Sequence, residues 1–432
     1  MEKIDKFVTK QQRLLRVEQL AVTRQAKKQL KELGNVVEVK VVDSRAQTRY
    51  GGSRLKLERR DSGSRVPKFN VGESIALDAD DDEDSEPIHG ILKKVFLNTY
   101  EVELEISESV EVFKEKRKWD LLKRNDNASF KQMEEALKKI SLQASPLRDV
   151  LLGLRQPSRV PVQDSSLLPQ NNCLDPSQRK AVQFALRQRE LAVIHGPPGT
   201  GKTTTLVEIV RQAVRGREKV LVTAGSHVAV DNIGEKLAGE GLKILRLGHP
   251  ARVTSEAVLN YSLGVKMKEQ FEIAAELKFE FSRLRRELHS GIKQDGVTVR
   301  RELKRLKKNL AIQQVKLRTM REKMILEADV VLGTLIGCGS ELSFLDSRPG
   351  HHFHLTIIDE CGQSLEMACW IVIPRAPKLI LAGDHHQLPP TVVTKSKEAS
   401  AELSKSLMER VLEMLFYGFG AHMLQVVSEV DI

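Results

Sequence analysis

The sequence has few aromatic residues, few cysteines and no long apolar run. Phe, Trp and Tyr make up 4% of the 432 residues, so the composition does not indicate a series of aromatic platforms for base stacking. The four cysteines form neither a CxxC pair nor the dense spacing of a disulfide scaffold, which predicts plain thiols in a reducing compartment. No apolar run approaches the roughly 20 residues of a membrane span, and the N-terminal "MEKIDKFVTKQQ" lacks the apolar core of a signal peptide. We therefore expect a soluble intracellular protein.

Charge is plentiful and unevenly distributed. The chain has 69 Lys and Arg against 58 Asp and Glu, a net charge of +11, and residues 262–328 alone hold 17 Lys and Arg against 9 Asp and Glu. This segment has a helical pattern broken by the turn signal "KQDGVT", which predicts an antiparallel helical hairpin. Two interpretations stay open: a solvated pair of charged helices, or a nucleic-acid contact in which Lys and Arg neutralise phosphates.

The N-terminal third predicts a small β-barrel on a helical stalk. Residues 1–34 and 115–155 carry apolar residues at helical spacing, so each can cover the apolar stripe of the other. Between them, residues 35–114 contain short alternating runs such as "VVEVKVV", which favour antiparallel barrel strands. The acidic run "DADDDEDSE" lacks the ordered spacing of a calcium loop and is interpreted as a solvated loop.

A different rhythm begins at Leu191, where short continuous apolar runs alternate with helical stretches. "LAVIH", "KVLVTA", "LKILRL", "DVVLGT", "LTIID" and "KLILAGD" are typical of strands buried on both faces, which predicts an α/β domain with a parallel sheet over residues 156–261 and 329–411. The basic hairpin, residues 262–328, is inserted into this domain. Residues 156–172 are predicted to form its entry linker, and residues 412–432 a divergent C-terminal tail.

"HGPPGTGKTT", from His195 to Thr204, is the clearest motif in the chain. It matches the G-x-x-x-x-G-K-[ST] pattern, with an apolar strand before it and a helical run after it, as a phosphate-binding loop requires. Backbone N–H groups and the positive end of a helix bind phosphate in such a loop, which predicts ATP as the ligand. Lys202 would reach the β- and γ-phosphates, and Thr203 would bind Mg²⁺. The predicted cofactor-binding residues of this loop are Gly196, Pro197, Pro198, Gly199, Thr200, Gly201, Lys202, Thr203 and Thr204.

"LTIIDECGQSLE" ends an apolar strand in two adjacent carboxylates, Asp359 and Glu360. Like charges repel and burial of charge is unfavourable, so the pair needs a chemical reason. Nucleotide hydrolysis supplies one, because it needs a carboxylate for Mg²⁺ and a second acid for the attacking water. We assign the metal role to Asp359 and the general-base role to Glu360.

"LAGDHHQLPP" also places polar residues at a strand end. Asp384 and Gln387 are predicted to approach the γ-phosphate, and Gln387 is counted as catalytic. The histidines at 385 and 386 have no partner ligands at a recognised spacing, so the sequence predicts no metal site there.

Several ordered motifs together resemble the superfamily 1 helicases of the up-frameshift type, and most nearly their immunoglobulin mu-binding group. They are "LDPSQRKAV", "HGPPGTGKTTT", "VAVDNI", "LRLGHPAR", "IIDECGQSLE", "CWI", "LAGDHHQLPPT" and "SLMERV". The resemblance covers residues 10 to about 411 and implies a P-loop NTPase of RecA-like fold, with the barrel and the hairpin as its two insertions. It further implies ATP-driven 5′-to-3′ unwinding of single-stranded RNA and DNA, in the cytoplasm near ribosomes and partly in the nucleus.

The resemblance also implies roles for single residues. The amide of Gln178 would bind the adenine edge, and four residues would line the nucleic-acid path: Ser226, His227, Val230 and Thr334. Three features depart from the family pattern: "AGSH" stands for the usual Ala-Pro-Ser-Asn, His386 for a common Lys, and Gly362 for a customary Ala.

The largest departure follows "SLMERV", where no "QYRM"-like motif appears. We expect a chain that stops before the second RecA-like domain and the arginines that this domain supplies, which are worth about 10³ to 10⁵ in turnover. Two functions therefore stay open. One is an ATP-dependent helicase that is weakly active or inactive as this chain alone, and the other is an ATP-binding, nucleic-acid-binding module without motor activity.

Overall fold

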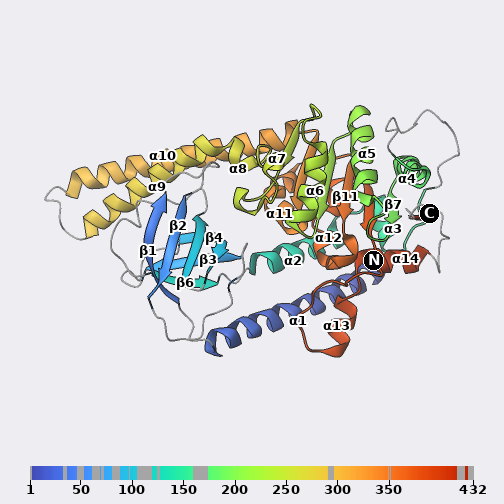
Figure 1. The fold of residues 1–432 in the computed structure, drawn as a ribbon, viewed down its shortest axis with the longest axis horizontal. Helices are drawn as coiled ribbons and strands as arrows, with labels where there is room; N and C mark the ends of the chain where they lie inside the picture. The colour runs from blue at the N-terminus through green and yellow to red at the C-terminus, as the bar shows by residue number, and fades with distance from the viewer. Residues whose placement is uncertain are drawn as a thin grey trace.

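The computed structural model describes residues 2–32, 37–45, 53–60, 69, 73–79, 88–96, 98–104, 119–123, 127–158, 174–289, 296–348, 350, 352–415 and 424–426. These residues form a closed barrel, a seven-stranded sheet with helices on both faces, and a long helical hairpin (Figure 1). Most of the predicted acidic loop, the predicted linker, the tip of the hairpin and much of the predicted tail lie outside the described residues. No helix in the described part of the chain is long and apolar enough to cross a membrane.

The sheet is parallel throughout, which confirms the prediction. Its order is β13 (Leu424–Val426), β7 (Leu191–His195), β12 (Lys378–Gly383), β11 (Leu355–Asp359), β8 (Val220–Ala224), β10 (Val330–Thr334) and β9 (Ile244–Arg246). Successive side chains point to opposite faces, so Leu191 and Val193 enter one core while Ala192 and Ile194 enter the other. Burial on both faces explains the continuous apolar runs. One strand, β13, comes from the predicted tail.

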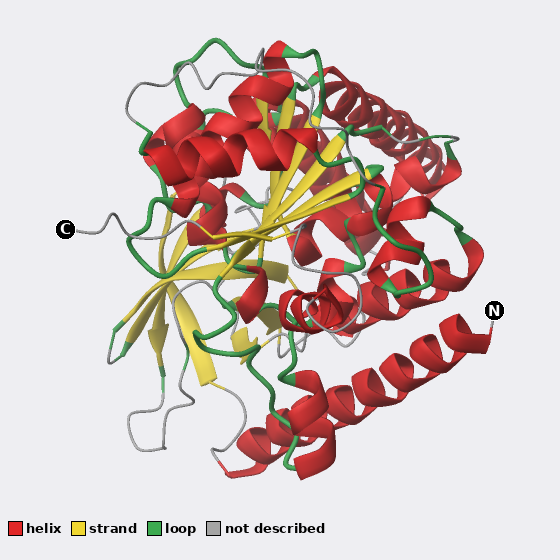
Figure 2. Cartoon of the chain, turned by 90° about the vertical axis from the view of Figure 1, so that its right-hand side faces the viewer, coloured by secondary structure: helices red, strands yellow, loops and turns green. Residues whose placement is uncertain are grey.

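Helices cover both faces of this sheet (Figure 2). The first face packs against α4 (Pro176–Arg187), α5 (Lys202–Arg215) and α6 (His227–Leu237). The second packs against α2 (Asn127–Leu142), α11 (Leu335–Glu341), α12 (Glu366–Cys369) and α14 (Leu407–Met414). Short helices complete the domain: α3 (Pro146–Leu151), α7 (Glu256–Leu259), α8 (Leu263–Lys266) and α13 (Lys397–Leu403).

The barrel is closed and antiparallel, in the order β1-β2-β5-β4-β3-β6. Its strands are β1 (Val37–Arg45), β2 (Arg54–Arg59), β3 (Ser74–Ala79), β4 (Ile88–Val95), β5 (Thr99–Leu104) and β6 (Trp119–Lys123). The sixth strand lies inside residues 115–155, which the sequence assigns to the stalk. Trp119 and Leu121 alternate into the barrel core and β6 pairs with both β1 and β3, so the barrel extends to Lys123.

Two long helical elements accompany the barrel (Figure 1). The stalk helix α1 (Glu2–Glu32) packs along α2, and its buried Glu18 accepts hydrogen bonds from the backbone of Val393 at 2.6 Å and Thr394 at 2.9 Å. The hairpin consists of α9 (Lys268–His289) and α10 (Gly296–Glu327), which pack against each other. Nine basic side chains of α10 are exposed: Arg300, Arg301, Lys304, Arg305, Lys307, Lys308, Lys316, Arg318 and Lys323.

Candidate nucleotide and nucleic-acid site

The loop between β7 and α5 has the geometry of a phosphate cradle. Gly199 and Gly201 have φ angles of +84° and +79°, in the left-handed region that glycine enters without strain. Lys202 is buried at the start of α5, and its ammonium donates to the carbonyl oxygens of Gly196 at 2.6 Å and Pro197 at 3.0 Å. The loop therefore carries a desolvated cation at the N-terminal end of a 14-residue helix, an arrangement that favours an anion.

Gln178 lies directly against this loop. Its Nε2 donates to the carbonyl of Thr200 at 3.2 Å, and its Oε1 accepts from the backbone of Asp175 at 3.2 Å in the capping box of α4. A Cβ on Gly201 would lie 2.3 Å from this Nε2. Gln178 thus ties α4 to the phosphate loop, and the second hydrogen of its amide is left for a ligand. On the other side of the loop, the hydroxyl of Thr204 accepts a hydrogen bond from the ammonium group of Lys236, in α6, at 2.9 Å.

The acid pair lies at the carboxyl end of β11, on the same edge of the sheet as the loop after β7, with β12 between them. Asp359 is 4% exposed, and burial together with the charge of Glu360 raises its pKa to about 7, against the lowering influence of Lys202. Glu360 has a φ of +51°, which is uncommon for a residue with a side chain. The end of β11 therefore combines repulsion between two carboxylates with an unfavourable backbone conformation. Lys202 is close enough to lower the pKa of Asp359 electrostatically.

Polar side chains at the end of β12 face the same edge. Asp384 is 7% exposed, and its oxygens accept from the backbone of His386 at 3.0 Å and from Gln387 Nε2 at 3.1 Å. His195 Nε2 lies 3.0 Å from Asp384 Oδ1. Burial would raise the pKa of Asp384, but these hydrogen bonds outweigh it and lower the pKa to about 2. The His195–Asp384 contact was not predicted, because it depends on β7 and β12 being neighbours.

The four residues predicted for the nucleic-acid path fall near the carboxyl ends of β8 and β10. Ser226 and Thr334 are N-caps, whose hydroxyls accept from Ala229 N and Gly337 N, both at 3.1 Å. Val230 is 0% exposed in the core beneath α6, so its side chain is not available for the predicted contact. The exposed apolar side chain of this turn is Val228, at 53%.

His227 is held by a buried ion pair that the sequence did not indicate. Arg246 and Asp231 are each 1% exposed and joined at 2.7 Å, and Arg246 Nη2 lies 3.0 Å from His227 Nδ1. Burial and the neighbouring arginines lower the pKa of His227 to about 4. This imidazole is therefore neutral at physiological pH and can act as a hydrogen-bonding group without a charge.

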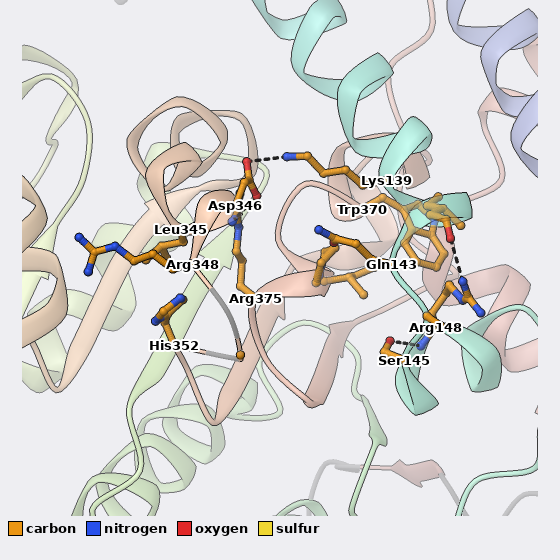
Figure 3. A pocket seen from close by; sticks show the side chains of 15 residues that line it. Lys139, Gln143, Ser145, Arg148, Leu345, Asp346, Arg348, His352, Trp370 and Arg375 are labelled. Atoms are coloured by element: carbon orange, nitrogen blue, oxygen red, sulfur yellow. Dashed lines mark hydrogen bonds and ion pairs between the residues drawn. The ribbon is translucent and has the colours of Figure 1, made fainter.

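A cavity of about 240 Å³ lies at the opposite, amino-terminal edge of the sheet, between the stalk helices and the segments that lead into β11 and β12 (Figure 3). Its basic side chains are already paired: Lys139 and Arg375 with Asp346, both at 2.7 Å, and Arg348 with Glu322 at 3.0 Å. Arg148, the other basic residue of the lining, is paired with Asp149 at 2.7 Å. Each Lys and Arg side chain of the lining therefore already has an acidic partner, so the cavity is not a candidate anion site.

Comparison with known proteins agrees with this geometry. The chain is 38% identical to "DNA-binding protein SMUBP-2" of Rattus norvegicus over 434 residues, covering 95% of this chain and 43% of that protein. It is 32% identical to an uncharacterized ATP-dependent helicase of Methanocaldococcus jannaschii over 70% of this chain and 49% of that protein. It is 36% identical to the "Regulator of nonsense transcripts 1 homolog" of Drosophila melanogaster over 55% of this chain and 19% of that protein.

These matches confirm the resemblance to up-frameshift-type helicases, and the chain spans less than half the length of these curated relatives. A sequence profile described as "AAA domain" matches residues 173–395, which include the phosphate loop, the acid pair and the strand end of β12. Because this match covers more than half of the chain, the protein belongs to the AAA domain family.

Proposed function

We propose that this chain is the ATP-hydrolysing part of an ATP-dependent nucleic-acid helicase. The observation that carries the proposal is the convergence of the β7–α5 loop, the acid pair of β11 and Gln387 on one edge of a parallel sheet. Relatives that are named ATP-dependent helicases support it. Ligands of open α/β sheets bind outside the carboxyl ends of the strands, which is where these groups lie.

The residues present fit a magnesium nucleotide. Asp359 is a buried carboxylate whose pKa is raised to about 7, so a cation beside it would stabilise its ionised form. We propose that Thr203 and Asp359 hold Mg²⁺, which would neutralise charge on the transferring phosphate. Lys202 binds the β- and γ-phosphates, Gln178 directs its free amide hydrogen to the adenine, and Glu360 takes a proton from the attacking water. Gln387, anchored to Asp384, senses the γ-phosphate.

Nucleic acid is the proposed partner, and the basic hairpin and the β8–β10 edge are its proposed contacts. Exposed Arg and Lys of α10 can neutralise backbone phosphates, which makes affinity dependent on salt. Ser226, His227 and Thr334 can offer hydrogen bonds at the sheet edge. The names of relatives, among them "DNA-binding protein SMUBP-2", support this partner. We propose single-stranded RNA and DNA as substrates, with 5′-to-3′ movement.

Single-turnover ATP hydrolysis tests the proposal, because enzyme in excess makes slow chemistry visible. Glu360→Gln should bind ATP as well as the unchanged chain but hydrolyse it about 10² to 10⁴ times more slowly, as expected for loss of a general base. Glu398→Gln, at an exposed position of helix α13, is the matched control. Failure of the unchanged chain to bind MgATP would contradict the proposal. Salt-dependent nucleic-acid binding and ATP binding without turnover would identify the second candidate, a binding module without motor activity.

Location and ribosome contact also belong to the proposal. Cys338, Cys361 and Cys369 are buried free thiols, which accords with a reducing compartment. We propose that the protein acts in the cytoplasm near ribosomes and partly in the nucleus. Imaging of the tagged protein together with ribosome sedimentation tests this, and a protein confined to an oxidising compartment would refute it.

A further inference from the structure

Three histidines meet between the ends of β7 and β12. His195 ends β7, and His385 and His386 follow β12, so residues far apart in the sequence become neighbours. One ring nitrogen of each lies within 4.8 Å of those of the other two. The ring centroids of His385 and His386 are 3.9 Å apart, and those of His195 and His385 are 4.8 Å apart. Three nitrogen donors therefore surround one small volume.

The hydrogen bonds around this cluster leave donor atoms unused. Nδ1 of His385 is buried and has no hydrogen-bond partner among the described residues, whereas buried polar atoms normally have one. Nε2 of His195 is engaged by Asp384 at 3.0 Å, which leaves the other ring nitrogen of His195 for a ligand. A buried, unpartnered nitrogen on one of three neighbouring imidazoles indicates an ion as the missing partner.

Asp384 has the position of an orienting carboxylate. Its Oδ1 already accepts from the backbone of His386, and its Oδ2 from Gln387, so its remaining role toward His195 is to fix the ring. Carboxylates that hold the second nitrogen of a ligating imidazole are a regular feature of metal sites. Asp384 is therefore a positioning residue for His195 and not a ligand itself.

We propose that His195, His385 and His386 bind one divalent transition-metal ion, with Zn²⁺ as the expected ion. Imidazole nitrogen suits Zn²⁺, Cu²⁺ and Ni²⁺, whereas Mg²⁺ prefers oxygen, so this site is distinct from the magnesium of the nucleotide. Three His ligands with an open fourth position are a known zinc arrangement with Zn–N distances of about 2.0–2.1 Å. The side chain of His386 is exposed, so its ring is free to move towards the rings of His195 and His385 when an ion binds.

Such an ion would connect His195, which directly precedes the phosphate loop, to the loop that carries Gln387. The two segments already touch, because Gly196 N donates to Gly383 O at 3.2 Å. An ion across them would hold Gln387 in one position, so Zn²⁺ should slow ATP turnover. This consequence rests on the proposed function, whereas the metal site does not.

Metal titration of the 432-residue chain, with any polyhistidine tag removed, tests the site without nucleotide. Co²⁺ should give a d–d absorption band that saturates at about one ion per chain, and Zn²⁺ should displace it. Loss of a group that only orients a ligand lowers metal affinity about 10- to 100-fold, so His386→Gln should lower Zn²⁺ affinity at least about tenfold. His354→Gln is the matched control, because His354 is exposed at the amino-terminal edge of β11, where its Nδ1 accepts from Lys219 N at 2.9 Å.

Three results would overturn the proposal: no Co²⁺ band, a Zn²⁺ affinity unchanged by His385→Gln and His386→Gln, or a thiolate charge-transfer band that marks cysteine ligands. Circular dichroism of each variant shows that it remains folded. A chain that binds Zn²⁺ through these histidines but fails to bind ATP would refute the proposed function alone. A chain that binds ATP but not Zn²⁺ would refute the metal site alone.

Discussion

The buried pair of Asp231 and Arg246 supports the edge of the sheet where nucleic acid is proposed to bind. Asp231 Oδ1 accepts from Arg246 Nε at 2.7 Å, and its Oδ2 accepts from Thr254 N at 2.7 Å and Thr254 Oγ1 at 2.9 Å. Arg246 in turn lies 3.0 Å from Nδ1 of His227, in the first turn of α6. Removal of Asp231 would therefore leave a buried guanidinium uncompensated and would deprive Arg246, the partner of His227, of its acidic anchor.

We expect Asp231→Ala to lower the free energy of unfolding by roughly 3–5 kcal/mol, the usual effect of breaking a buried ion pair on one side. Arg246→Met should be destabilising too, but the double variant should lose less than the sum of both. A coupling free energy of about 2 kcal/mol or more is expected for groups in direct contact. Urea unfolding followed by circular dichroism measures all three values.

The matched control is Glu134→Ala, which breaks the exposed pair with Lys138, at 2.8 Å, and should change stability by no more than about 1 kcal/mol. Asp231→Ala should also weaken single-strand binding, because Arg246, which holds His227, loses its acidic partner, while MgATP binding at the β7–α5 loop is retained. A coupling energy near zero would show that the two side chains do not stabilise each other as described. Equal loss of nucleotide and nucleic-acid binding would show that the effect is not local to α6.

Three further outcomes follow from the site. Lys202→Ala removes a charged donor to phosphate worth about 1.5–3 kcal/mol, so affinity for a fluorescent ATP analogue should fall about 10- to 100-fold, and unchanged affinity would remove the phosphate-loop assignment. The free energy of unfolding should decrease as pH falls from 6.5 towards 4, because the pKa of His227 is about 4 in the folded chain and the unfolded chain therefore binds the proton first. His227 contributes about 3 kcal/mol of this loss. His227→Gln should therefore give a flatter dependence on pH in urea unfolding. Gly201→Ala and its control Gly239→Ala share a left-handed φ, at +79° and +82°, but only the first places a Cβ against Gln178, at 2.3 Å, so only Gly201→Ala should weaken nucleotide binding in equilibrium titrations.

The sequence predicted the parts of the fold that depend on local pattern. Continuous apolar runs predicted the parallel strands, and the motif "HGPPGTGKTT" predicted the strand–loop–helix order of β7 and α5. Phosphate binding by this loop stays a prediction. The sixth barrel strand was missed because "WDLLK" is short and flanked by charged residues, and its alternation lasts only from Trp119 to Leu121. Val230 was placed in the nucleic-acid path by resemblance alone, although its helical spacing with Ile233 and Leu237 puts all three on the buried face of α6.

The histidine cluster shows a different kind of limit. A metal site was not predicted because His385 and His386 lack partners at a recognised spacing in the sequence. The third nitrogen comes from His195, and only the strand order β7-β12 brings it to them. Long-range strand order is set by tertiary packing and by the crossover connections, neither of which is encoded in a local pattern.

The acid pair explains why a strained backbone is kept at Glu360. With a φ of +51°, this residue lies in a region where a side chain costs about 1–2 kcal/mol, and Gly would relieve that cost. Glu360→Gly should therefore be more stable than Glu360→Ala by about 1 kcal/mol in urea unfolding, while both variants should lose hydrolysis equally. Equal stability of the two variants would mean that the left-handed turn is not a source of strain. The expected result would show that the fold accepts a conformation that costs stability at the residue whose carboxylate hydrolysis requires.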